Sequence, residues 1–245
     1  MKLSKTALSL LLAGGIVLAG CSAQEEEVKS SAEPETEEVE TEAKDTEEVI
    51  EEPTEEPDNK QEYDEETGRG YVEGLGYVET VGVGYNEEIG IDGVGDNPLK
   101  PIKMGTMELE ISSLAILEIE PEEDVKEYSF GGKDKVKAIV VSMKTENTSE
   151  EDVTFYPNQS IMVTDTGEQV EPDMMLMGDA GGDFLGKVKK EGQTWWLLEH
   201  DTDISEVTMI IGAPYSAEDW EDMGDEKRLE FEVLNWEEAM ERDDR

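Results

Sequence analysis

The sequence is poor in the residues from which most catalytic and metal sites are built. Its 245 residues include a single cysteine, Cys21, and a single histidine, His200. One cysteine permits no intrachain disulfide, and one histidine excludes a multi-histidine metal site. Cys21 belongs to an N-terminal targeting motif described below, so no cysteine remains for Cys-His catalysis. No Gly-x-Ser-x-Gly segment accompanies His200, so we expect a histidine without a catalytic role.

Positive charge is also scarce. The chain has 20 Lys and Arg against 64 Asp and Glu, a net charge of -44. A surface of this sign repels phosphate backbones and anionic lipid headgroups, so we expect no nucleic-acid partner. Two carboxylate clusters, within residues 120–124 and 219–222, could hold Ca²⁺ weakly. Because tight binding needs a preformed cage of oxygen ligands, we expect solvated acidic surface and no cofactor.

Long apolar runs are absent as well. The run from Ala7 to Val17 falls short of the roughly 20 residues that a transmembrane helix needs. It follows Lys2 and Lys5 and leads into Leu18-Ala19-Gly20-Cys21, which resembles the lipobox of bacterial lipoprotein signals. The resemblance implies that residues 1–20 are a signal peptide and that Cys21 is lipidated. The protein would then be lipid-anchored on the outer face of the cytoplasmic membrane. A plain secretory signal with an accidental cysteine is the alternative.

Residues 21–66 follow as an acidic segment with little apolar surface. From residue 24 to residue 66 the chain carries 21 Asp and Glu against three Lys, with three prolines among them. Such a composition cannot bury enough apolar surface to offset the chain entropy. We therefore expect a lipidated N-terminus and a disordered linker that holds the domain away from the membrane. An acidic tail that binds cationic partners or metal is the alternative.

Residues 67–99 are glycine-rich and contain a weak repeat of Gly-Tyr pairs at Gly70-Tyr71, Gly76-Tyr77 and Gly84-Tyr85. Neither a dinucleotide-binding loop nor a phosphate-binding loop is present, because the required third glycine and the Gly-Lys-Ser/Thr end are missing. The sequence predicts an approach segment that adds an irregular strand or packs its tyrosines onto the following domain.

From Thr106 onward, apolar residues recur with the period of two that is typical of strands. The apolar residues change from odd-numbered to even-numbered positions at Ser112-Ser113, as a β-bulge would produce. Residues 138–141 are apolar at both odd and even positions, which is typical of a central strand covered on both faces. Six or seven short strands and a short polar helix near residues 235–242 follow from this pattern. The sequence therefore predicts an all-β, immunoglobulin-like antiparallel β-sandwich over residues 100–245.

Four short motifs in this part of the chain resemble Gram-positive lipoproteins with a telokin-like, immunoglobulin-type domain of unknown function. They are the strand Met104–Ile111, the strand and turn Lys137–Ser149, Asp165-Thr166-Gly167 and Glu191–Thr194. The resemblance covers roughly residues 100 to 235. It implies the same sandwich fold and supplies no catalytic residues. The strand pairing around residues 170–190 is left open.

Adjacent tryptophans, Trp195 and Trp196, are the strongest candidates for an interaction surface. On a strand they point to opposite faces, so one joins the core and the other could form an exposed aromatic platform. A second layer covering that face is the alternative. We expect a non-catalytic module that binds an envelope protein, a peptide or a cell-wall component. An envelope hydrolase or metal-dependent enzyme of unrecognised type is the other function class, and a cleft of convergent polar groups would favour it.

Overall fold

A computed structural model describes residues 63–64, 67–93 and 98–243. The predicted signal peptide, Cys21 and nearly all of the predicted linker lie outside these residues. In the part of the chain that the model describes, no helix has both the length and the apolar character to cross a membrane.

Strands make up most of the described chain. Those of the first half are β1 (Tyr63–Asp64), β2 (Arg69–Val72), β3 (Gly76–Tyr85), β4 (Ile102–Met104), β5 (Met107–Pro121), β6 (Val136–Asn147) and β7 (Val153–Phe155). Those of the second half are β8 (Ile161–Thr164), β9 (Gln169–Val170), β10 (Gly182–Phe184), β11 (Lys189–Leu197), β12 (Glu206–Ile211), β13 (Tyr215–Ser216) and β14 (Lys227–Asn235). The helices are α1 (Glu123–Phe130), α2 (Trp236–Asp243) and the 3₁₀ helix η2 (Pro157–Gln159).

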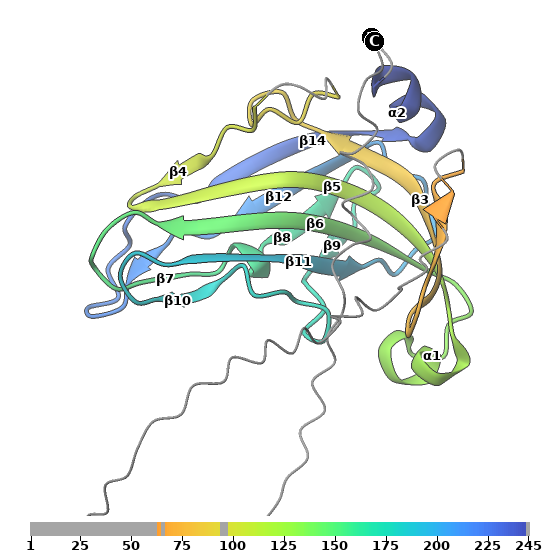
Figure 1. Cartoon of the computed structure of the whole chain (residues 1–245), viewed down its shortest axis with the longest axis horizontal. Coiled ribbons are helices and arrows are strands. Elements are labelled where there is room, and N and C mark those ends of the chain that lie inside the picture. Colours follow the sequence, from red (N-terminus) through yellow and green to blue (C-terminus); the bar gives the residue numbers. More distant parts are fainter. Residues whose placement is uncertain (1–62, 65–66, 94–97, 244–245) are drawn as a thin grey trace, which may run out of the picture. The chain divides into compact units, whose positions relative to one another are not determined.

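One antiparallel sheet runs in the order β11-β6-β5-β3-β14-β12-β8-β9, and it curls so that its two halves face each other (Figure 1). A separate sheet has the order β10-β7-β13. The main core lies between the halves and holds buried side chains from β5, β6 and β11 together with those from β8, β12 and β14. The prediction of an all-β antiparallel sandwich is confirmed, with layers that are two halves of one curled sheet.

Strands β5 and β6 are covered on both faces, as the apolar run at residues 138–141 predicts. One face points into the main core, while Ala138 and Val140 belong to a second cluster with Phe130 of α1. All residues from 136 to 141 are buried. The register of β5 against β6 shifts between Ile111 and Ser113, which confirms the predicted bulge.

The glycine-rich segment is part of the sheet. Strand β3 pairs with β5 on one side and β14 on the other, so the predicted boundary between residues 99 and 100 separates no structural units. Glycine at position 84 leaves room for Leu114, because a Cβ there would lie 2.7 Å from the Leu114 side chain and force it to move. Glycine in this predicted approach segment therefore allows close contact with the neighbouring strand β5.

A loop covers part of the outer edge of β11. The Asp173 N–H donates to the Trp195 carbonyl at 2.8 Å, and the Gly178 N–H donates to the Gln193 carbonyl at 2.8 Å. An isolated bridge between Met177 and Thr194 lies between them. Strand β9 ends at Val170, and residues 171–178, whose pairing the sequence left open, form this edge cover.

The predicted C-terminal helix is confirmed as α2. Its residue Ala239 packs on Val83 and Tyr85 of β3. Helix α1 was not predicted, because its eight residues carry four charges and one buried side chain, Phe130. It ends at Gly131, whose left-handed backbone (φ +59°) caps the last turn.

Candidate functional site

The two candidate tryptophans are both buried. Trp196 is 0% exposed in the main core, and its indole N–H donates to the Ser160 carbonyl at 2.8 Å. Trp195 is 8% exposed in the second cluster, on the opposite face of β11. The prediction that one of them forms an exposed aromatic platform is wrong, because a second layer covers that face of the strand.

An exposed aromatic surface is formed elsewhere, at the small sheet β10-β7-β13. Trp220 is 73% exposed, and its ring stacks on Tyr215 with the centroids 5.5 Å apart and the planes at 18°. Tyr156, which follows β7, is also exposed. We call Tyr156, Tyr215 and Trp220 the aromatic surface.

A tight hairpin of residues 214–223 holds the stacked pair. The Ser216 N–H donates to the Glu221 carbonyl at 2.9 Å, and the Met223 N–H donates to the Pro214 carbonyl at 2.7 Å. At the tip, the Trp220 N–H donates to the Ser216 carbonyl at 3.1 Å. The blue strand segments beside β7 and β10 in Figure 1 include this hairpin.

Trp220 adopts a left-handed backbone conformation, with φ +65°. It is the one non-glycine residue of the described chain with a positive φ. For a bulky side chain this conformation costs free energy, which the surrounding hydrogen bonds must offset. The hairpin therefore holds a large apolar ring in solvent at some cost to the fold, a combination that is typical of functional positions.

The small sheet brings the other members of the surface together. Thr154 of β7 lies directly opposite Tyr215 on one side and Asp183 on the other, so all three side chains share one face. The Thr154 hydroxyl donates to the Asp183 carboxylate at 2.8 Å. Partial burial, and then the nearby Asp183 charge and Tyr215, raise the pKa of the Tyr156 hydroxyl. The aromatic rings therefore border a carboxylate.

Carboxylates surround Trp220 within its own hairpin: Glu218, Asp219, Glu221 and Asp222 are all exposed. In the part of the chain that the structure describes, none of these four forms a salt bridge with Lys or Arg. Hydrogen bonds from the Ser216 side chain and the Glu221 N–H lower the pKa of Asp219, so this group is ionised at neutral pH. The aromatic surface therefore lies in a strongly negative field.

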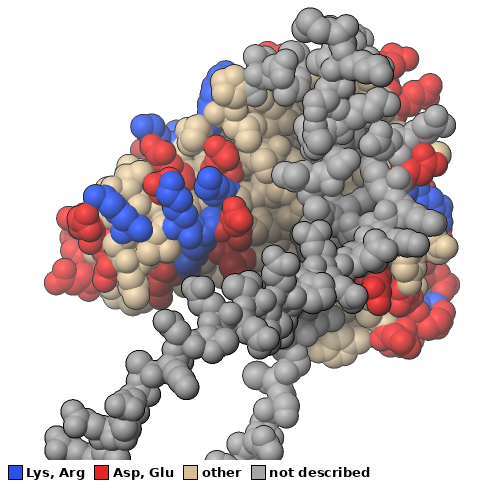
Figure 2. Space-filling model, in the orientation of Figure 1, with Lys and Arg blue, Asp and Glu red and all other residues tan. Residues whose placement is uncertain are grey.

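Lysines on other strands have carboxylate partners. Figure 2 shows blue side chains interspersed with red ones over the ends of β4, β6 and β11. Lys103 contacts Glu108 at 3.1 Å, and Lys189 contacts Glu146 at 2.8 Å across neighbouring strands. These lysines are matched by carboxylates and give a mixed surface, in contrast to the unmatched charges of the Trp220 hairpin.

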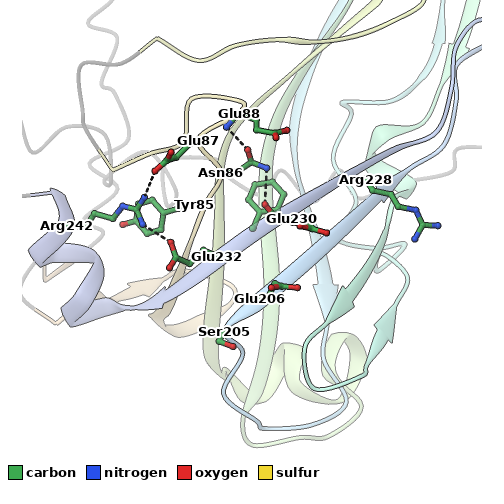
Figure 3. Close-up of a pocket in the computed structure, with 11 residues that line it drawn as sticks. Tyr85, Asn86, Glu87, Glu88, Ser205, Glu206, Arg228, Glu230, Glu232 and Arg242 are labelled. Carbon is green, nitrogen blue, oxygen red and sulfur yellow. Dashed lines mark hydrogen bonds and ion pairs between the residues drawn. The ribbon is translucent and has the colours of Figure 1, made fainter.

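A polar hollow of about 800 Å³ lies between β3, β12, β14 and α2 (Figure 3). Arg242 contacts Glu232 at 2.9 Å and Glu87 at 3.6 Å, and its guanidinium lies 4.3 Å from the Tyr85 ring centroid. Asn86 donates to the Glu230 carbonyl at 3.0 Å. Burial raises the pKa of Tyr85. These groups fasten α2 and the turn after β3 to β14, so their polar atoms serve the fold.

The remaining candidates are dispersed. His200 is exposed, with Nδ1 3.3 Å from a Glu168 carboxylate oxygen. Of the first acidic cluster, Glu120 pairs with Arg69 at 3.0 Å and Glu122 accepts the Tyr71 hydroxyl. Among the described residues, no group of three or more His, Cys, Asp or Glu is arranged to hold a metal ion. The second acidic cluster is the one that surrounds Trp220.

No family model matches the chain. YonS, an uncharacterized lipoprotein of the SPbeta prophage in Bacillus subtilis strain 168, is 31% identical over 99 residues, covering 39% of this chain and 48% of YonS. The chain thus spans about half the length of this curated relative.

Two solved structures are similar to parts of the chain. One is a functionally unknown protein from Listeria monocytogenes EGD-e, 13% identical with a TM-score of 0.37 over 45% of this chain and 68% of that one. The other is ycdA from Bacillus subtilis, 10% identical with a TM-score of 0.38 over 59% of this chain and 41% of that one.

Proposed function

We propose that the protein is a lipid-anchored lipoprotein on the outer face of the cytoplasmic membrane. The lipobox at Cys21 supports this proposal, because a cysteine preceded by small residues and an apolar run is the acceptor of bacterial lipoprotein lipidation. The local similarity to YonS, which is named a lipoprotein, agrees with it. The sandwich-like fold and the four motifs support a telokin-like, immunoglobulin-type domain.

The domain is a non-catalytic binding module, and its binding site is the aromatic surface. The observation that carries this assignment is the Tyr215–Trp220 stack, with Trp220 held 73% exposed at a left-handed position. An exposed ring offers a large contact area and loses little conformational freedom on binding.

The test is differential capture from solubilised envelope, with the purified protein prepared from residue 22 onward so that it carries no lipid. Trp220→Ala should lose the partner that wild type enriches. Tyr128→Ala is the matched control, because Tyr128 is 77% exposed on α1 and lies outside the aromatic surface. Helix α1 precedes β6 and the small sheet follows it, so about 40 Å of strand separates the two positions. Equal capture by wild type and both variants would refute the assignment.

A further inference from the structure

The described chain contains two places where a cation lies over a tyrosine ring with carboxylates beside it. Arg242 lies 4.3 Å from the Tyr85 ring centroid and contacts Glu232 and Glu87. Arg69 lies 5.1 Å from the Tyr77 ring centroid and contacts Glu79 and Glu120 at 3.5 and 3.0 Å. In both, the ring and the carboxylates attract the same guanidinium from different sides.

The Trp220 hairpin has the same composition without the cation. It presents an indole, the ring type with the strongest attraction for cations, and four carboxylates within two residues of it. Of the Lys and Arg residues that the structure describes, none lies over Trp220, and none pairs with the four carboxylates. Tyr215 covers one face of the indole, and the high exposure of Trp220 leaves the other face open to solvent.

We infer that the aromatic surface binds a basic polypeptide segment, whose Arg or Lys side chain stacks on Trp220 between the hairpin carboxylates. This inference rests on the proposed function, since it names the partner of the same surface. Charge complementarity selects the occupant. A cation gains from both the ring and the carboxylates, whereas a neutral sugar stacked on the ring gains little from this much negative charge.

Asp183 supplies a further carboxylate on β10, which pairs with β7 on the side opposite β13. Its side chain is exposed, and one of its carboxylate oxygens accepts from Thr154 at 2.8 Å. A basic segment that stacks on Trp220 can therefore run past Tyr215 and place a second cation at Asp183. Such a segment would follow the line of side chains that β13, β7 and β10 present on one face.

The test uses the purified protein from residue 22 onward and a Gly/Ser peptide with Arg at every third position. The same peptide with Gln in place of Arg is the neutral control. Binding is measured by calorimetry and by the Trp220 indole N–H signal in NMR spectra, assigned from its loss in Trp220→Leu. We expect the Arg peptide to shift this signal. We expect Trp220→Leu to weaken binding about 2- to 30-fold, the range of a cation–aromatic contact.

Two matched pairs of substitutions distinguish the effect of the hairpin carboxylates on binding from the effect of the protein's net charge. Glu218→Gln with Glu221→Gln removes two of the four negative charges of the hairpin, and Glu123→Gln with Glu127→Gln removes the same charge from α1. The hairpin pair should weaken binding of the Arg peptide at least about threefold more than the α1 pair, because a charge beyond the Debye length is largely screened. Thermal melts of all variants check that each is folded.

Three results would overturn the inference: equal weakening by the two pairs, an unchanged affinity in Trp220→Leu, or equal binding of the Gln peptide. A soluble cell-wall glycan that shifts the Trp220 signal regardless of the hairpin charges would assign the surface to sugar instead. Loss of envelope capture in Trp220→Ala without binding of the Arg peptide would leave the proposed function standing and refute only the basic partner.

Discussion

Trp196 joins the two halves of the curled sheet, and its replacement by phenylalanine should destabilise the domain strongly. The residue lies on β11 at one end of the strand order, while its hydrogen-bond partner Ser160 directly precedes β8 near the other end. Both residues are buried, and Trp196 is fully enclosed. Trp196→Phe keeps an aromatic ring in the core but removes the indole N–H.

Two effects set the magnitude. The Ser160 carbonyl loses its side-chain donor in a place without solvent, which costs about 1–3 kcal/mol. The smaller ring buries about 40 Å² less apolar surface, which costs about 1 kcal/mol at 25 cal/mol per Å². The free energy of unfolding should therefore fall by about 2–4 kcal/mol. For a domain of this size that corresponds to a decrease in Tm of about 5–15 °C.

Urea unfolding followed by far-UV circular dichroism measures the loss. Trp220→Phe is the matched control: it makes the same chemical change at an exposed ring, where we expect less than about 0.5 kcal/mol. The m-value should stay unchanged, since both variants expose the same surface on unfolding. A loss below about 1 kcal/mol in Trp196→Phe would show that the link between β11 and Ser160 contributes little.

Three further predictions concern the anchor, the charge and the response to pH. Cys21→Ala should move the protein out of the membrane fraction, and equally firm retention of the variant would rule out a lipid anchor. The Tm should rise smoothly with NaCl as ions screen the acidic surface, with Ca²⁺ adding little; a saturable rise at micromolar Ca²⁺ would reveal a metal site. Hydrogen bonds from Ser205 lower the pKa of Asp165, so this carboxylate stabilises the fold above the ordinary Asp range and loses that contribution as pH falls. Ser205→Ala should raise the pKa of Asp165 in an NMR titration and bring variant and wild type closer in stability at acid pH, whereas an unchanged pKa would contradict this.

The sequence predicts strands well where apolar residues alternate. The bulge near Ser112 and the doubly covered strand at residues 138–141 follow from parity, because each side of a strand must match its surroundings. Strand β3 was missed as a central strand, since its glycines are usually rare in strand interiors. There they reflect close packing against β5 and β14, which no local pattern reveals.

The aromatic surface was missed for a related reason. Tyr156 and Trp220 lie far apart in the sequence, and they come together only through the pairing of β13 with β7. Trp195 and Trp196 drew attention because they are adjacent, yet adjacency on a doubly covered strand buries both rings. One local signal was available: Trp220 is a lone large aromatic residue between acidic neighbours, in a segment with no apolar alternation.

The loop over β11 has a consequence for how the protein behaves among its own copies. An uncovered edge strand presents a row of free N–H and carbonyl groups, onto which another chain can add a strand. Hydrogen bonds from Asp173 and Gly178 occupy part of that row on β11 with the protein's own backbone. A strand from another copy of the protein therefore finds these carbonyl groups of β11 already bonded, which disfavours strand addition at this part of the edge.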